Sequence, residues 1–344
     1  MLYSVAVYAA MLWALWVAHG HEVNSNQYDD SIVALYHLMF LLLVVVVPFT
    51  NWKDAPVLAQ YVSSWLRFQT EFRRVTAQTL SLSLRKRAWC LALLVPAASL
   101  SLECCYQLLD TSINLVQLVT DVYLLVLRVL LTVVWHFCCR ALCKAAEDTL
   151  HSFRKELVSV TVSHAVWAEY RILWLSLAKL TRQTGVATCF TFGFFILYMF
   201  TKLTLNVYWT INALLFAPTR FFVVAYICIT IVNDMILMYV ICDNAQTVQS
   251  RVGDAFKDTL MDYRTHGIKD SVQDEVLAFL QVIDSCPPVL NLGNFVIVSR
   301  RLLISLGSVM VTYLVVLLQF KVSHLSTGKV NNSTSSHNYT NKYG

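Results

Sequence analysis

The sequence predicts an all-α membrane protein that crosses the bilayer seven times, with its N-terminus inside and its C-terminus outside. Three observations predict this fold class: the composition, the length of the apolar stretches, and the uneven distribution of basic residues between them. Of the 344 residues, 57% are hydrophobic and only 14% are charged, whereas a soluble domain carries about 25% charged residues. A soluble fold of this size cannot bury so much apolar surface, so the composition indicates a polytopic membrane protein.

Seven stretches are long and apolar enough to be transmembrane helices, which need about 20 residues each. They are residues 2–19, 32–49, 88–109, 113–139, 186–209, 221–241 and 302–320. Their length excludes a β-barrel, whose spans are about 10 residues of alternating character. The first stretch also resembles a signal peptide, but it lacks a basic start and a clear cleavage site, so a retained helix is favoured.

Basic residues set the expected orientation. They concentrate in the loops after the second, fourth and sixth stretches, and the alternate loops are nearly bare. Because cytosolic loops are enriched in Lys and Arg, the three basic loops are expected in the cytosol, where they contact lipid headgroups rather than nucleic acid. The tail then lies outside, which agrees with its N-glycosylation sequons at Asn331, Asn332 and Asn338.

The inner loops are expected to be helical. Residues 145–180 and 271–285 have apolar positions at helical spacing, and Pro287 and Pro288 end the second of these segments. We therefore expect the fourth, fifth and sixth spans to extend into the cytosol, and residues 289–301 to form a short helix that enters the last span. The predicted units are 1–139 with the first four spans, 140–185 as a helical anchor, 186–242 with two spans, 243–301 as the third inner loop and short helix, 302–320 as the last span, and 321–344 as an extracellular tail.

A polar stripe runs along the last predicted span. It consists of Ser305, Ser308, Thr312 and Gln319, which share one helical face. Tyr313 and Phe320 form the adjacent face. Hydrogen bonding between membrane helices explains such a stripe, and so does a water-facing pore wall. Since one helix cannot line a pore, the second explanation requires several chains around an axis, with Gln319 ringing the mouth and Phe320 closing it by dewetting.

Residues 312–320, TYLVVLLQF, resemble the signature of the insect gustatory receptor family: Thr-Tyr, five apolar residues and Gln-Phe in the last span. The seven spans, the inverted orientation and the helical inner loops are similar to the family as well. The resemblance implies a ligand-gated, non-selective cation channel, a tetramer with itself or other gustatory receptors, that senses small-molecule tastants at the plasma membrane of sensory neurons. It assigns Thr312, Tyr313, Gln319 and Phe320 to the pore helix, with Gln319 and Phe320 at the gate.

Two features depart from the family. Its members usually have a cytosolic segment before the first span, which here begins at residue 2. Its sugar receptors often carry Glu after the Thr-Tyr pair, where this chain has Leu314, and this favours bitter or other non-sugar ligands. An accessory subunit that conducts beside a partner receptor is an alternative. A G-protein-coupled receptor is another, although D-R-Y and N-P-x-x-Y motifs are missing from the expected places and the charge bias is inverted.

Ionisable residues inside spans are candidates for function. Arg128 and Asp234 lie at similar expected depths in 113–139 and 221–241 and are expected to pair, with Asp121 as the rival partner of Arg128. By the family's pattern, the ligand site lies between the outer halves of the second to sixth spans. The candidates there are Tyr36, His37, Tyr106, Gln107, Gln117, Asp121, Tyr198, Asn206, Tyr208, Trp209 and Tyr226.

Nothing in the sequence points to an enzyme. It has no P-loop, G-x-G-x-x-G, H-E-x-x-H or G-x-S-x-G motif, so neither catalytic residues nor a cofactor are expected. His136, Cys139 and Cys143 share a helical face, but a fourth ligand is missing, so no metal site is expected. Palmitoylation of Cys138, Cys139 or Cys143 is favoured over metal binding.

Overall fold

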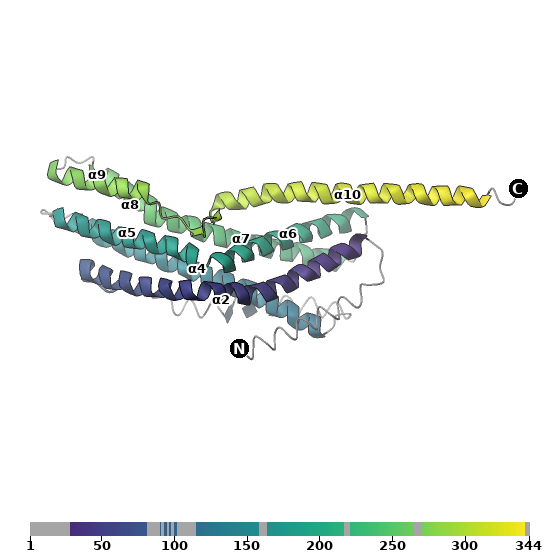
Figure 1. The fold of residues 1–344 in the computed structure, drawn as a ribbon, viewed down its shortest axis with the longest axis horizontal. Coiled ribbons are helices and arrows are strands. Elements are labelled where there is room, and N and C mark those ends of the chain that lie inside the picture. Colours follow the sequence, from purple (N-terminus) through teal and green to yellow (C-terminus); the bar gives the residue numbers. More distant parts are fainter. Residues whose placement is uncertain are drawn as a thin grey trace.

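The computed structural model describes residues 28–80, isolated positions between 90 and 101, and residues 115–157, 164–216, 221–264 and 270–340. The predicted span 2–19 and most of the span 88–109 lie outside the described residues. The described chain is almost entirely helical, which confirms the all-α class. Figure 1 shows long helices side by side in an elongated bundle. In chain order they are α2 (Tyr28–Thr76), α4 (Leu115–Leu157), α5 (His164–Ala187), α6 (Cys189–Phe216), α7 (Phe221–Gln249), the π-helix η1 (Ser250–Asp254), α8 (Ala255–Arg264), α9 (Asp270–Ser285) and α10 (Arg300–Thr340).

Four of the described helices are long and apolar enough to cross a membrane, at Leu125–Leu157, Cys189–Leu215, Val224–Tyr263 and Arg300–Ser323. These correspond to the fourth, fifth, sixth and seventh predicted spans. As expected, α4 continues well past its span, and α7 continues through η1 into α8.

The helix α2 also continues far beyond its predicted span of 32–49 and ends at Thr76. Its extension carries aromatic side chains at helical spacing, Tyr61, Trp65, Phe68 and Phe72, whose successive ring centroids are 6.1–6.4 Å apart. Three of these side chains are buried. Exposed residues, among them Arg67, alternate with this stripe in the sequence. The stripe packs α2 against the rest of the bundle.

Aromatic side chains fill the core of the predicted cytosolic half. The ring of Phe153 contacts those of Trp167, Tyr170 and Phe279, joining α4, α5 and α9. The indole of Trp174 donates a hydrogen bond of 2.8 Å to the carbonyl of Val252 in η1. Burial raises the pKa of the Tyr170 phenol to about 12, so this side chain packs as a neutral group. Residues 140–157 and 164–185, the described part of the predicted anchor, are helical.

The helices α5 and α6 are separated by a break at Thr188, which sets the start of the fifth span. Asp54 of α2 closes the first turn of α6: its Oδ2 atom accepts hydrogen bonds from the Thr191 amide at 2.9 Å and from the Thr191 hydroxyl at 2.8 Å. A carboxylate at a helix N-terminus satisfies free amides and complements the helix dipole. This contact fixes α6 against α2.

The prediction of a short helix at residues 289–301 is wrong. This segment forms an antiparallel hairpin of β1 (Asn291–Leu292) and β2 (Val296–Ile297), with Leu292 opposite Val296. The pairing leaves a loop of Gly293, Asn294 and Phe295 between the strands. The φ angles of Gly293 and Asn294 are 56° and 65°, and positive φ angles of this kind let the chain reverse direction. A short apolar run does not distinguish a strand from a helix. Gly and Asn adopt positive φ angles readily, and this pair therefore favours a turn.

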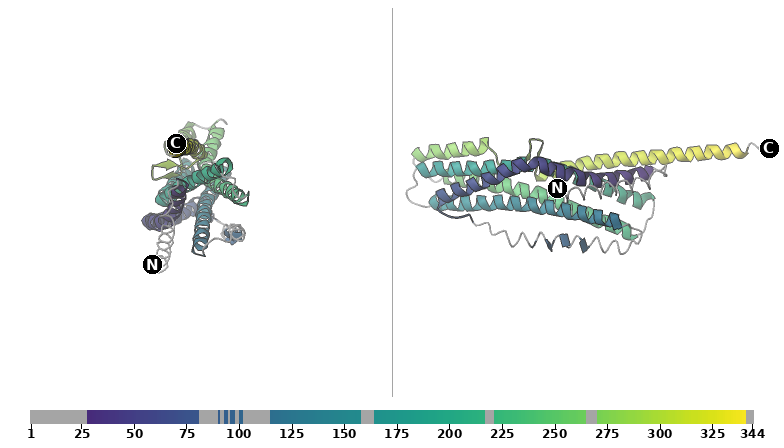
Figure 2. Two further views of the ribbon diagram at one scale, coloured as in Figure 1. Left: turned by 90° about the vertical axis from the view of Figure 1, so that its right-hand side faces the viewer. Right: turned by 60° about the horizontal axis from the view of Figure 1, so that its bottom comes forward.

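The helix α10 begins directly after the hairpin and runs to Thr340, so it does not end at residue 320 as predicted. Figures 1 and 2 show α10 along one side of the bundle, with its C-terminal part projecting beyond the other helices. The predicted tail is therefore helical through most of its length.

Candidate functional site

The polar stripe of α10 faces away from the protomer. Ser305, Ser308, Thr312 and Gln319 are all exposed. The Thr312 hydroxyl donates a hydrogen bond of 3.2 Å to the carbonyl of Ser308, within the helix itself. The adjacent Tyr313 and Phe320 side chains are 56% and 62% exposed. The described helices of the protomer therefore leave this face available to water, lipid or other chains.

The opposite face of α10 packs against α6. Leu314 is buried with Leu205 and Tyr208, and Leu317 and Leu318 pack against the same cluster. Leu314, where the sugar receptors of the resembled family often have Glu, points into this contact between helices rather than along the polar stripe. At the other end of the span, Arg300 donates two hydrogen bonds to Asp243 of α7, at 2.9 Å from Nε and 2.5 Å from Nη2.

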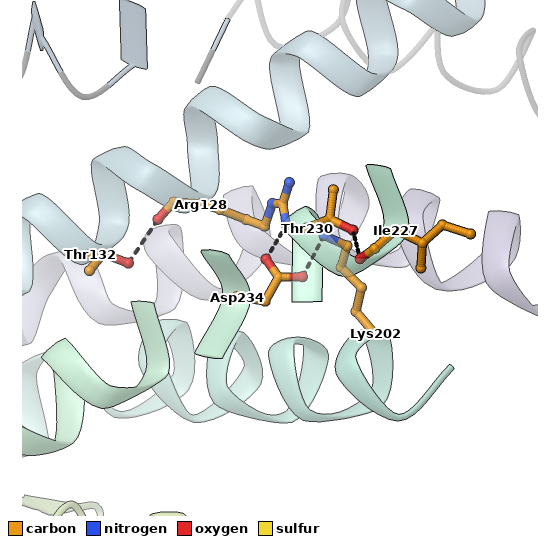
Figure 3. Close-up of polar contacts among 6 residues, drawn as sticks. All are labelled: Arg128, Thr132, Lys202, Ile227, Thr230 and Asp234. Atoms are coloured by element: carbon orange, nitrogen blue, oxygen red, sulfur yellow. Dashed lines mark hydrogen bonds and ion pairs between the residues drawn. The ribbon is translucent and has the colours of Figure 1, made fainter. Parts of the chain in front are cut away.

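Arg128 and Asp234 come together across α4 and α7. Arg128 Nη1 lies 2.7 Å from Asp234 Oδ1, and both side chains are buried. Figure 3 shows that a third side chain, Lys202 of α6, points to the same carboxylate; its Nζ lies 2.7 Å from Asp234 Oδ2. One carboxylate thus binds a cation from each of two neighbouring helices, and all three side chains are buried.

Sequence reasoning missed Lys202, although the signal was present. Lys202 is an ionisable residue inside the predicted span 186–209, and the rule that selected Arg128 and Asp234 applies to it equally. The rival partner Asp121 lies on α4, in the part of that helix whose side chains the structure does not describe.

The other ligand candidates divide into four groups. Tyr198, Asn206 and Tyr208 of α6 are buried, whereas Trp209 and Tyr226 are half-buried. The side chains of Tyr36, His37 and Gln117 lie outside the description, on described backbone, and Tyr106 and Gln107 lie outside the described residues altogether. The buried candidates come from one helix, α6, which also carries Lys202 and packs against α10.

The sequons Asn331, Asn332 and Asn338 lie on the C-terminal part of α10, where the structure describes the backbone but not the side chains. Near the predicted inner membrane edge, His136 Nδ1 lies 3.1 Å from Asn244 Oδ1. Cys139 and Cys143 are buried in the core. Within the described ranges, no three side chains of the metal-binding types come together.

Nearly the whole chain is similar to known proteins. A family model described as 7tm Chemosensory receptor matches residues 1–324. The chain is 31% identical to "Gustatory and odorant receptor 24" of Anopheles gambiae over 301 residues, 87% of this chain and 64% of that protein. It is 25% identical to "Gustatory and odorant receptor 22" of the same mosquito, over 94% of this chain and 70% of the relative.

A third relative is "Gustatory and odorant receptor 21a" of Drosophila melanogaster, 23% identical over 87% of this chain and 65% of its own length. The chain thus spans about two thirds of the length of these relatives. Among solved structures, it is similar to the insect olfactory receptor OR5 from Machilis hrabei, with a TM-score of 0.54 and 14% identity, over 93% of this chain and 89% of that one. At this identity, the likeness supports a shared fold.

Proposed function

The chain belongs to the insect 7tm chemosensory receptor family, and we propose that it is a tastant-gated, non-selective cation channel whose pore is lined by α10. One observation carries this proposal: within the described part of the chain, α10 packs on the face that carries Leu314 and leaves the polar stripe exposed. A polar face on a membrane helix is costly against lipid and is expected to face protein or water. A ring of α10 helices around a central axis provides that environment.

The proposed assembly is a tetramer, formed with itself or with other gustatory receptors. In such a ring, four copies of the polar stripe face the axis, and Gln319 and Phe320 lie toward the predicted outer end. Gln319 then offers neutral dipoles to passing cations, and Phe320 forms an apolar constriction. The absence of charge on the stripe is consistent with weak selectivity among cations.

The proposed ligand is a small molecule of the bitter or another non-sugar class. Leu314 supports this choice, because it buries an apolar side chain against Leu205 and Tyr208 where sugar receptors often have a carboxylate. The relatives are named as both gustatory and odorant receptors, which extends the candidate ligands to odorants. The proposed binding site lies in the outer half of the bundle near Tyr198, Asn206, Tyr208, Trp209 and Tyr226. A ligand opens the pore only if it binds the open state more tightly than the closed state.

The test is electrophysiology on the full chain in a heterologous cell, alone and with a partner receptor, against a panel of tastants and odorants. We expect Gln319→Ala to change conductance or relative permeability while surface expression stays the same. The matched control is Val311→Ala, an exposed position on the same helix away from the stripe, which should behave as wild type. Equal currents from both variants would contradict a pore lined by Gln319. Current only in the presence of a partner would make the chain an accessory subunit.

A further inference from the structure

Lys321, directly after Phe320, is buried against another helix and does not extend into water as a lysine at a membrane surface usually does. Its neighbours Phe320, Val322 and Ser323 are exposed, whereas Lys321 is only 7% exposed. Its ammonium donates a hydrogen bond to the side-chain Oδ1 of Asn212 on α6, and Asn212 is 6% exposed. A lysine near the end of a membrane helix normally extends its charge into water, so this burial requires a specific reason.

The contact lies in register with the apolar packing of the same two helices. Leu314 lies seven residues before Lys321, and Leu205 lies seven residues before Asn212, and these two leucines share one buried cluster. The helices α6 and α10 therefore pack in parallel, and the Lys321–Asn212 contact is the polar end of an otherwise apolar seam.

The position of Lys321 on the helix determines where the polar stripe points. At 100° per residue, Ser305, Ser308, Thr312 and Gln319 lie about 140–200° around the helix from Lys321. Leu314 and its packing neighbours lie on the same side as Lys321. Holding Lys321 against α6 therefore directs the stripe straight away from the protomer, and places Phe320 on its flank.

Apolar packing alone would hold this orientation weakly. Lipid tails solvate a leucine face as well as another leucine face does, so the specificity of helix packing in a membrane depends on close fit and on hydrogen bonds between helices. On the α10 side of the seam, Leu314, Leu317 and Leu318 are aliphatic, and they pack against apolar and aromatic side chains of α6. The Lys321–Asn212 contact adds a directional bond at the end of α10 nearest to Gln319.

We propose that Lys321 and Asn212 are positioning residues that hold α10 in the rotation that keeps the pore closed in the absence of ligand. This inference rests on the proposed channel function, and it assigns a role to two residues outside the TYLVVLLQF segment. Loss of the contact lets α10 turn or tilt, so that Phe320 leaves the constriction. The contact thus shifts the equilibrium between the closed and the open pore toward the closed state.

The first test measures basal Cs⁺ current without ligand, normalised to surface expression. We expect Lys321→Met and Asn212→Leu each to raise the basal current about threefold or more, the shift that follows from losing one hydrogen bond between membrane helices. The double variant should give no further increase, and the exchanged pair Asn212→Lys with Lys321→Asn should restore the wild-type level. The control Val322→Met, at the next and exposed position, should leave the current unchanged. Single variants at the wild-type level, independent effects in the double variant, or failure of the exchange to restore would overturn the proposal.

The second test separates this inference from the proposed channel function. Gln319→Cys is labelled with a membrane-impermeant maleimide, in the wild-type and Lys321→Met backgrounds, and each background without the new cysteine corrects for native thiols. We expect the labelling rate at position 319 to differ by about twofold or more between the two backgrounds. An unchanged rate overturns the role of Lys321 whether or not the chain conducts. If the labelling rate changes but the chain carries no current, alone or with a partner, the result supports the Lys321–Asn212 contact and contradicts the proposed channel function.

Discussion

Asp234 is a buried carboxylate with two buried cationic partners. It is fully buried and accepts hydrogen bonds from Arg128 of α4 and Lys202 of α6, so three membrane helices meet at one carboxylate. Taking charges out of water costs several kcal/mol per ion, and only close partners with good geometry offset that cost. The three residues should therefore behave as a unit rather than as independent pairs.

This unit predicts an order of effects. Asp234→Ala removes the carboxylate that two buried cations share, and we expect it to destabilise the fold by about 3–5 kcal/mol. Arg128→Met should cost less, because Lys202 still holds Asp234 in that variant. Thermal unfolding of detergent-purified protein measures both, with the exposed Ile236→Ala on the same helix as the control. If Arg128→Met proved the more damaging of the two, the shared carboxylate would not be the centre of the unit.

At the scale of elements, the hairpin between α9 and α10 sets where the last helix begins. It lies against α5 at Gly185, where an added Cβ would lie 2.4 Å from the backbone oxygen of Asn291. Backbone atoms cannot yield as a flexible side chain can. The glycine therefore allows a close approach of helix and hairpin, and through it fixes the start of α10.

Gly185→Ala is accordingly expected to destabilise the protein by about 1–3 kcal/mol, the usual cost of overpacking, and to lower its surface expression. Gly193→Ala on α6 is the matched control, because an added Cβ there meets nothing within 4 Å. That variant should be neutral or stabilising by up to about 1 kcal/mol, since Ala favours the helix. Thermal unfolding compares the two, and equal midpoints would mean that the hairpin can move away from α5 at no cost.

At the scale of the whole molecule, the direction of α10 connects the fold to the membrane. The helices α6 and α10 run in parallel, and Figure 1 shows α10 continuing past the end where α6 ends and α2 begins. The charge distribution predicts that this end is outside the cell, and the three sequons lie on it.

An epitope tag after Gly344 tests this orientation. We expect the tag to be stained on intact cells, and an endoglycosidase to increase the gel mobility of the protein. Replacing Asn331, Asn332 and Asn338 by Gln should abolish that shift. Staining only after permeabilisation would place the tail inside and reverse the direction of the proposed pore.

The sequence by itself determined the class of the molecule and most of its helices. Apolar length and charge bias are local properties, so they predicted membrane helices, the cytosolic continuation of α4 and α7, and the end of α9 before Pro287. The spacing of Ser305, Ser308, Thr312 and Gln319 likewise defined one face of a helix before any neighbour was known. Arg128 and Asp234 stood out because charge is rare inside a span.

Tertiary structure decided what each face meets. Local patterns did not predict that Lys202 joins Arg128 at Asp234, or that Lys321 contacts Asn212. They also left open whether the chain turns at Gly293 and Asn294. A charged or polar residue inside a span is expected to have a partner, because an unpaired polar group is costly there. Which residue that partner is depends on which helices pack together and in which register. For the same reason, the local pattern around Leu314 does not predict that its side chain points into the seam with α6. The packing of α10 on that side is what leaves its polar stripe exposed.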